Sequence, residues 1–173
     1  MSLTSSTPTP YLLTETAQGY AFITDAGEAY VLYYSPTVDY FPGLAVGEYA
    51  AMFGFMRVVA QGLDTDDITP EYDPRIKPTI LQELAHFFQG ERRVLTFVCQ
   101  DDKRQRAAYR HRLFGRWFRE ANEAHLVRHV VSEANGLYAT LIYLDTNPFA
   151  DELRHQLPKL EDKLNHMMGQ SPE

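Results

Sequence analysis

The chain of 173 residues has a mass of 19.8 kDa, and 45% of its residues are apolar and 13% aromatic, which is enough for one buried core. Its 23% charged residues are an ordinary share, so disordered, collagen-like and low-complexity classes are excluded. The net charge of −7 and the pI near 5.3 argue against binding of nucleic acid or an anionic membrane over the whole surface, because the average field repels phosphate.

The ends of the chain and its cysteine content indicate the setting of the protein. Cys99 is the one cysteine, which excludes an intrachain disulfide, and no stretch reaches the roughly 18 uninterrupted apolar residues of a membrane helix. The first ten residues are rich in Ser, Thr and Pro and lack the charged and apolar segments of a targeting peptide. We expect a flexible leader over residues 1–10, a single globular domain over residues 11–168, a tail over residues 169–173 and a cytoplasmic location.

Three strands are predicted in the first part of the domain. The β-branched and aromatic runs at residues 20–24 and 29–34 flank a turn in which Gly27 can adopt a positive φ, so they predict a hairpin. Alternating apolar residues predict a third strand over residues 48–59.

The pattern changes at Arg75, where apolar residues begin to recur every three or four positions. This spacing predicts an amphipathic helix with Asp73 as its N-cap and Pro74 in its first turn, ending at Gly90. The apolar run at residues 93–99 is typical of a strand buried inside a sheet.

The second half of the chain predicts a helix and another hairpin. A helix is expected over residues 103–119, where Asp101 and Asp102 would lie at its positive end. The runs at residues 126–131 and 137–144 flank Asn135-Gly136, the dipeptide that most readily forms a type I′ turn.

A last helix is predicted from about Phe149, with Pro158 expected to kink it. It carries a narrow seam of apolar side chains. These are Leu153, Leu157, Leu160, Leu164 and Met167. The seam either packs on the chain's own sheet or builds a homodimer.

The order of these elements is βββαβαββα. It predicts an α+β (mixed α/β) fold with a single twisted mixed sheet of about six strands and helices that cover the sheet. The third strand, the first helix and the fourth strand are expected to form a parallel crossover.

Basic residues are concentrated in one segment. Residues 92–119 hold nine of the sixteen Lys and Arg residues against two acids, a net charge of +7, so the rest of the chain carries −14. Such a segment is either the solvated face of a helix or a surface for a phosphate-bearing ligand, nucleic acid or an acidic partner.

Two arginines of this segment fall in the apolar sector of the predicted helix. At about 100° per residue, Arg106 and Arg110 project on the same side as the apolar residues. A guanidinium there needs a partner, because an unpaired buried charge is too costly. The partner is a structural carboxylate such as Asp73 or Asp145, or an anion that enters at the carboxyl end of the central strand.

Cys99 lies at the same strand end, where Lys103, Arg106 or His111 could favour a thiolate. The alternative interpretation is a buried cysteine that acts as a small hydrophobe.

No metal site is predicted. His125 and His129 would lie about 13 Å apart on a strand, and one cysteine cannot supply a zinc cage. A calcium loop that starts at Asp64 fails, because the glycine position holds Thr69 and the closing glutamate position holds Arg75. The sequence also lacks a nucleophile elbow, a phosphate-binding P-loop and a dinucleotide fingerprint.

Residues spread over most of the chain resemble an uncharacterised family of small proteins from Bacteroidetes-type bacteria. The residues that carry this resemblance are Asp73-Pro74-Arg75-Ile76-Lys77-Pro78-Thr79-Ile80, Phe87-Phe88, Cys99, Asp102, Arg104-Gln105, Arg110, Leu113-Phe114, Trp117-Phe118 and Asn147-Pro148. The resemblance implies lineage and a cytoplasmic setting, since the family has no assigned activity.

The predicted order of elements also resembles the core of the GCN5-related N-acetyltransferase superfamily, and residues 106–118 look like the segment after its fifth strand. Those enzymes hold the pyrophosphate of acyl-coenzyme A on the backbone amides of a Q/R-x-x-G-x-G/A loop. The corresponding residues 73–78 contain no glycine, and Pro74 and Pro78 lack N–H donors. The resemblance therefore implies an acyltransferase-like sheet without the usual coenzyme loop.

We expect a ligand- or partner-binding module with a basic helix over an acidic body and no cofactor or catalytic residue. The candidate anion-binding residues are Arg75, Arg106 and Arg110, with Asp73 or Asp102 as orienting carboxylates. The expected partner is a small anionic ligand or an acidic protein, rather than a membrane or nucleic acid. The alternative is an N-acyltransferase with coenzyme A as its cofactor.

Overall fold

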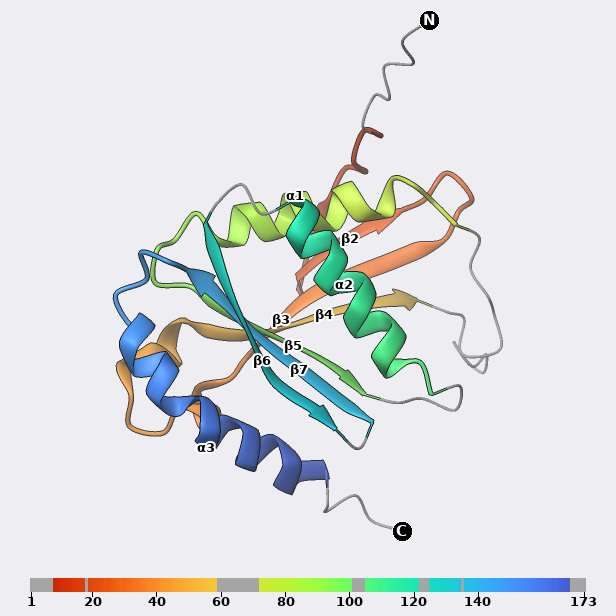
Figure 1. The fold of residues 1–173 in the computed structure, drawn as a ribbon. Helices are drawn as coiled ribbons and strands as arrows, with labels where there is room; N and C mark the ends of the chain where they lie inside the picture. Colours follow the sequence, from red (N-terminus) through yellow and green to blue (C-terminus); the bar gives the residue numbers. More distant parts are fainter. Residues whose placement is uncertain are drawn as a thin grey trace, which may run out of the picture. The chain divides into compact units, whose positions relative to one another are not determined.

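The computed structural model describes residues 8–17, 19–58, 72–100, 105–121, 125–134 and 136–168. Seven strands of this part of the chain form one open mixed sheet in the order β1-β2-β3-β4-β5-β7-β6, accompanied by three α-helices (Figure 1). The expected mixed α+β class is confirmed. The chain divides into two compact units, which are described separately. The expectation of one domain over residues 11–168 stays a prediction.

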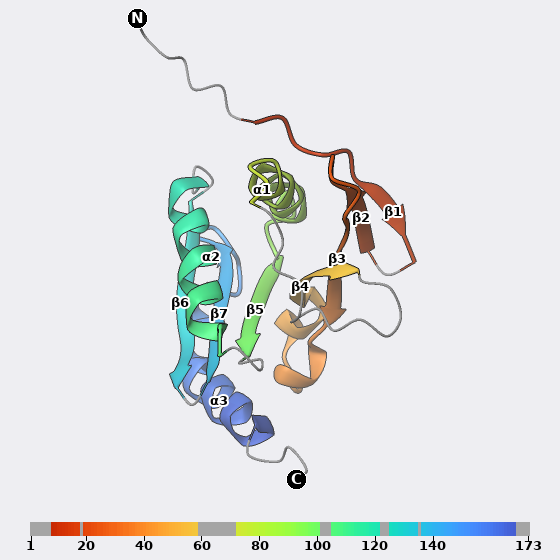
Figure 2. The ribbon, with the colours of Figure 1, turned by 90° about the vertical axis from the view of Figure 1, so that its right-hand side faces the viewer.

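Unit 1 comprises residues 1–33 and 55–87. Its elements are β1 (Thr14–Thr16), β2 (Gly19–Ile23), the greater part of β3 (Ala29–Pro36), the end of β4 (Ala50–Val58) and α1 (Ile76–Phe87). The predicted hairpin is confirmed, because β2 and β3 pair antiparallel and Gly27 has a φ of 81°. Strand β1, which was not predicted, pairs antiparallel with β2, and Figure 2 shows the two side by side.

A stack of aromatic rings forms the core of unit 1. The ring of Phe22 lies 5.5 Å from that of Tyr11 and 5.3 Å from that of Tyr30, and the Tyr30 ring lies 5.2 Å from that of Phe55. These planes are nearly parallel, so each ring buries its face against the next. Phe22, Tyr30 and Phe55 are therefore packing residues.

Unit 2 comprises residues 34–54 and 88–173. Its elements are the greater part of β4, the short 3-10 helices η1 (Val38–Tyr40) and η2 (Ala45–Tyr49), β5 (Val94–Gln100), α2 (Ala107–Ala121), β6 (Leu126–Ala134), β7 (Leu137–Leu144) and α3 (Ala150–Met168). The predicted parallel crossover is confirmed, because β4 and β5 pair parallel from Ala50↔Val94 to Phe53↔Phe97. The third predicted strand begins at Ala50 rather than Glu48, since η2 precedes it.

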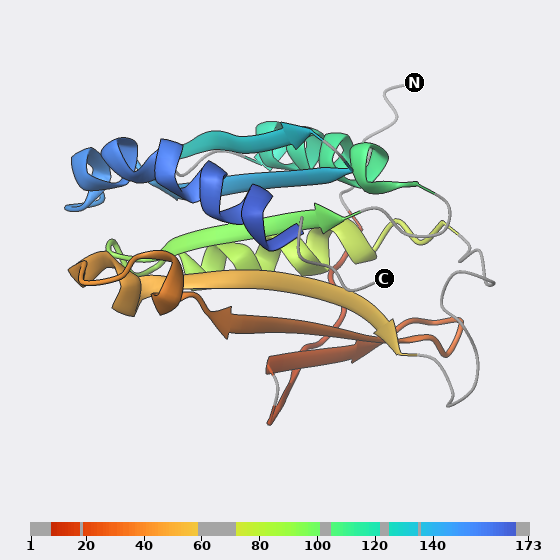
Figure 3. The same ribbon diagram turned by 90° about the horizontal axis from the view of Figure 1, so that it is seen from below.

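Strand β7 lies between β5 and β6 and pairs antiparallel with both. Successive side chains of a strand point to opposite faces, so the strand serves two helices. Thr140 contacts His111 of α2, whereas Leu141 belongs to the same cluster as Leu153 of α3. Figures 1 and 3 show α2 and α3 on opposite sides of β6 and β7.

The side of the sheet that faces α3 holds the main apolar core of unit 2. The buried members of this core are Phe41, Val46, Ala50, Val94, Val131, Leu137, Ala139, Leu141, Tyr143, Leu153, Leu160 and Leu164. Three leucines of the α3 seam are among them, and Leu157 packs against them partly buried. The seam therefore packs on the sheet of its own chain, so these three leucines are not free to form the homodimer that the sequence left open.

Helix α2 begins later than predicted. Gln105 has a left-handed φ of 50°, which no α-helix accommodates, and the Arg106 carbonyl accepts a hydrogen bond from the Arg110 N–H at 3.0 Å. Arg106 is thus the residue that precedes the helix. Asp101 and Asp102, which were expected at the helix start, lie outside the described residues.

Replacing Leu160, which is 2% exposed, by Ala should destabilise the protein by about 2–5 kcal/mol, because the change leaves a cavity under α3. Urea unfolding at one protein concentration measures this loss. The control is Glu161→Ala on the exposed side of the same helix, for which we expect a change within about 0.5 kcal/mol. An unchanged unfolding midpoint accompanied by dissociation of a dimer would contradict the assignment of the seam to the chain's own core.

Candidate functional site

Arg75 is held by groups of unit 1. Its Nη1 lies 2.9 Å from the Asp25 carboxylate, its Nε donates to the Thr9 carbonyl at 2.8 Å, and its Nη2 donates to the Pro10 carbonyl at 3.3 Å. The guanidinium also lies 3.9 Å from the centre of the Tyr11 ring. Thr9 and Pro10, which the sequence assigned to the leader, are therefore tied to the start of α1.

Asp73 has the capping role that the sequence predicted for it. Its Oδ1 accepts a hydrogen bond from the Arg75 N–H at 2.8 Å, and its Oδ2 accepts one from the Tyr11 hydroxyl at 2.7 Å. The carboxylate thus satisfies the free amide of Arg75, the residue that precedes α1. Of the sequence-predicted site residues, Arg75 and Asp73 are brought together by these structural contacts.

The N-terminus of α1 has few amide donors left for an anion. The Arg75 N–H binds the Asp73 side chain and the Ile76 N–H binds the Asp73 carbonyl at 3.3 Å, while Pro74 and Pro78 have no N–H. Phosphate binding at a helix start needs several free amides that point at the ligand. This turn is therefore poorly suited to the pyrophosphate of a coenzyme.

Arg106 and Arg110 belong to unit 2, and both side chains are half-buried. Asp102, one of their proposed orienting carboxylates, lies outside the described residues, and Asp145 is exposed. Cys99 is 4% exposed, and burial raises the pKa of its thiol to about 11, although the nearby Arg110 charge acts in the opposite direction. The thiol is therefore protonated at neutral pH and unsuited to nucleophilic attack.

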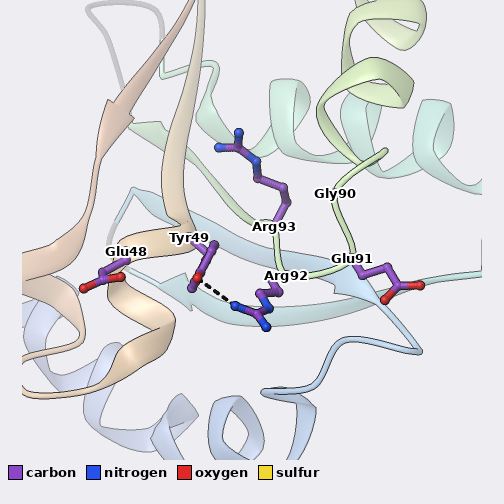
Figure 4. Close-up of a pocket in the computed structure, with 6 residues that line it drawn as sticks. All are labelled: Glu48, Tyr49, Gly90, Glu91, Arg92 and Arg93. Atoms are coloured by element: carbon purple, nitrogen blue, oxygen red, sulfur yellow. Dashed lines mark hydrogen bonds between the residues drawn. The ribbon is translucent and has the colours of Figure 1, made fainter.

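A cavity of about 500 Å³ opens at the amino end of β5 (Figure 4). It is lined by Glu48, Tyr49, Gly90, Glu91, Arg92 and Arg93. Arg92 donates to the Tyr49 hydroxyl at 2.9 Å. Figure 4 shows the carboxylates of Glu48 and Glu91 pointing away from each other. The polar groups do not converge on one point, so the cavity lacks the arrangement of a binding or catalytic site.

A second polar cluster lies between α2 and the β6–β7 hairpin. The Nε2 of His111 lies 2.7 Å from the Thr140 hydroxyl and 3.2 Å from Nη2 of Arg128, and its Nδ1 lies 3.6 Å from the Glu133 carboxylate. A guanidinium can only donate, so Nε2 accepts and the proton of the neutral ring is on Nδ1, toward Glu133. Burial, and then the charge of Arg128, lower the pKa of His111 from 6.5.

The sequence carboxylate, imidazole, hydroxyl is the arrangement of a nucleophilic triad. Here, however, Thr140 is 0% exposed and His111 is 3% exposed. A carbonyl substrate cannot reach a hydroxyl that no solvent touches. Glu133, His111 and Thr140 therefore fix the packing of α2 on β7 and do not form a catalytic site.

The exposed border of this cluster is basic. Arg128 extends from β6 toward Gly115 of α2, where Nη1 of Arg119 also lies within 4 Å of the position that a Cβ would occupy. Arg112 is near enough to lower the pKa of His111. We call Arg112, Arg119 and Arg128 the α2–β6 cation cluster. Burial, and then the charge of Arg119, lower the pKa of Arg128 from its usual value.

Arg128 has an incomplete set of partners. Its Nη2 contacts His111 and, at 3.5 Å, the Thr140 hydroxyl, while its buried Nε has no hydrogen-bond partner. A buried donor left unpaired costs about 1–3 kcal/mol. Its Nη2 thus contacts two neutral groups, and the Glu133 carboxylate acts on the Arg128 charge only from beyond salt-bridge distance.

Sequence reasoning missed Arg128 and Gly115. Arg128 stands alone on a strand, at a distance in sequence from the other arginines, so only the pairing of β6 with β7 brings it to the side of α2. A signal for Gly115 was present, because a glycine inside a helix costs about 1 kcal/mol relative to alanine and usually has a packing or functional reason.

Among the described residues, no three His, Cys, Asp or Glu side chains cluster in a way that could hold a metal ion. His125 precedes β6 and His129 lies within it. Residues 64–71 of the failed calcium loop are outside the described ranges. Also within those ranges, no helix combines the length and the apolar character needed to cross a membrane.

A model for a family of unknown function, DUF6169, matches residues 72–159, slightly more than half of the chain. The expectation of an uncharacterised family is thereby confirmed. No curated protein and no solved structure matches the chain. The resemblance to the acetyltransferase superfamily is not confirmed by any of these comparisons.

The buried Cys99 should not react with a maleimide at pH 8 in the folded protein, because its pKa of about 11 leaves almost no thiolate and its side chain is covered. Mass spectrometry measures the adduct. Full labelling in guanidinium chloride is the control for reagent activity, and rapid labelling without denaturant would contradict the assignment.

The depressed pKa of His111 predicts how stability depends on pH. The unfolded chain, with a pKa near 6.5, binds a proton before the folded protein does, so stability is greatest above pH 6.5 and is lost as the pH falls toward the folded pKa. Urea unfolding between pH 8 and pH 5 should therefore show a smaller loss for His111→Gln than for the unchanged protein. An equal loss in both would show that His111 does not contribute.

Proposed function

Since the chain belongs to a family of unknown function, we propose from its own geometry that it is a binding module, which captures a small anionic ligand on the α2–β6 cation cluster. The cluster combines two side chains of α2 with one of β6, so it exists only in the folded unit. The module needs no cofactor in this proposal.

One observation carries the proposal: the three arginines of the cluster have no carboxylate at salt-bridge distance, whereas four arginines elsewhere in the described chain do. Arginines elsewhere pair with acids in Arg57–Glu28, Arg75–Asp25, Arg116–Glu120 and Arg154–Asp151. Within the described part of the chain, no carboxylate lies at salt-bridge distance from Arg112, Arg119 or Arg128. Three cations with no acid at that distance are an arrangement that an anion would stabilise.

The charge of the helix supports the same function. Between Ala107 and Ala121, α2 carries four arginines and one acid, Glu120, while the whole chain has a net charge of −7. A local positive field on an acidic protein attracts compact anions. A long polyanion would also be repelled by the negatively charged rest of the protein. A small ligand is therefore favoured over nucleic acid. The alternative ligand of the cluster is a carboxylate side chain of an acidic protein.

The competing proposal is acyl transfer from coenzyme A to an amine. It draws on the order of elements, with a parallel β4–β5 pair and β7 inserted between β5 and β6. The start of α1 argues against it, because Asp73 already accepts hydrogen bonds from the Arg75 and Ile76 amides that a coenzyme pyrophosphate would need. The anion-binding module is the better supported function of the two.

We predict that inorganic phosphate raises the thermal unfolding midpoint of the protein in proportion to the logarithm of its concentration above the Kd. The double variant Arg112→Gln/Arg119→Gln should lose this stabilisation, because two of the three cations are gone. Arg154→Gln is the matched control, since this exposed arginine lies on α3 and is paired with Asp151. Differential scanning fluorimetry at constant ionic strength measures the shifts.

Two results would contradict the proposal. Equal stabilisation of the double variant and the unchanged protein would show that phosphate binds elsewhere. Stabilisation by acetyl-coenzyme A at micromolar concentration, with none by phosphate, would favour acyl transfer instead.

A further inference from the structure

Gly115 occupies an unusual place in α2. It is buried in the middle of a helix of 15 residues, where glycine lowers helix stability relative to alanine. A Cβ at this position would lie 3.4 Å from Nη2 of Arg128 and 3.8 Å from Nη1 of Arg119, which is ordinary van der Waals contact. Alanine would therefore fit, so steric exclusion does not explain why the position is a glycine.

The missing side chain leaves open space between the helix backbone and two guanidinium groups. Arg119 follows Gly115 by one helical turn, and Arg128 reaches the same point from β6. The two positive charges repel each other, as the effect of Arg119 on the pKa of Arg128 indicates. Glu133 favours the charge of Arg128 from beyond salt-bridge distance and lies 3.6 Å from Nδ1 of His111. Two like charges are thus brought together without an anion between them.

We propose that Arg119 and Arg128, above Gly115, form a seat for a phosphoryl group, so that the ligand of the module is a phosphate monoester. This inference rests on the proposed function and names its ligand class. A tetrahedral dianion offers three oxygens in different directions and can accept from two guanidinium groups at once. A carboxylate is planar, carries one charge and is satisfied by one guanidinium.

The contacts of Arg128 preorganise its guanidinium for binding a phosphoryl group. His111 and Thr140 hold its Nη2, so the guanidinium does not have to be ordered when the ligand arrives. Its Nε is covered and has no partner, so we assign the contact with the ligand to Nη1 and Nη2 of the guanidinium. Arg119 is exposed and supplies the second guanidinium from the solvent side.

Phenyl phosphate and benzoate are the probes, because they share a ring and differ in the anion. Isothermal titration at constant ionic strength should give a Kd for phenyl phosphate that is lower by about tenfold or more, as expected when charge-assisted hydrogen bonds to a second guanidinium are added. Equal affinities for the two probes would overturn the assignment to a phosphoryl group.

Gly115→Ala tests the seat without removing a charge. Its Cβ would occupy the space over which the two guanidinium groups meet, so the affinity for phenyl phosphate should fall by about tenfold, while the thermal unfolding midpoint stays the same or rises because alanine favours the helix. Arg116→Gln is the matched control on the same helix, where the arginine is paired with Glu120, and should bind phenyl phosphate like the unchanged protein.

The two proposals fail in different ways. Loss of binding in Arg119→Gln together with full binding in Gly115→Ala would leave the anion-binding module standing and overturn the seat at Gly115. Full binding of phenyl phosphate in both variants would overturn both proposals. Arg128→Lys keeps the charge but not the fork of donors, so its weaker binding of phenyl phosphate would support the seat and unchanged binding would contradict it.

Discussion

The pairing of β7 between β5 and β6 is the constraint on which unit 2 depends. Because side chains of a strand alternate, β7 gives each helix a different surface. Leu141 and Tyr143 join the apolar core under α3, whereas Thr140 contacts His111 of α2. The side of the sheet that faces α3 is packed by apolar contacts. The side that faces α2 has polar contacts, and the cation cluster lies next to them.

This division explains why the candidate site is on the side of α2. If a helix covered a sheet with apolar side chains alone, it would offer no hydrogen-bond acceptor to an arginine of a neighbouring strand. Here Arg128 reaches α2 because His111, which is neutral and buried, accepts a hydrogen bond from it, and the guanidinium ends beside Gly115. The same contacts that attach the helix therefore position a guanidinium beside it.

The elements that periodicity governs were predictable from the sequence. The hairpin around Gly27 and the parallel crossover from β4 to β5 occur as expected, because apolar alternation and turn residues determine them locally. Strand β1 was not predictable, since Thr14–Thr16 is exposed and has no apolar residue. The start of α2 was misplaced because the left-handed backbone of Gln105 has no signature in composition.

Of the candidate site, only the positive charge was predictable from the sequence. The excess of arginine in α2 indicated a positive surface, but an angular projection ranks side chains within one helix and cannot include a strand that approaches from outside. It therefore emphasised Arg106, which precedes the helix, and Arg110 instead of Arg119. Arg75 was a candidate by charge alone, and its role emerges from Asp25 and two carbonyl groups.

Arg75 and Arg128 are both partly buried, but the groups around them differ. Arg75 is surrounded by a carboxylate, two carbonyl oxygens and an aromatic face, so its charge and its donors are matched within unit 1. Arg128 is met by an imidazole, a hydroxyl and a second arginine, and it keeps an unpaired buried donor. The first arrangement is complete as a structural pair, whereas the second has a carboxylate, Glu133, only beyond salt-bridge distance.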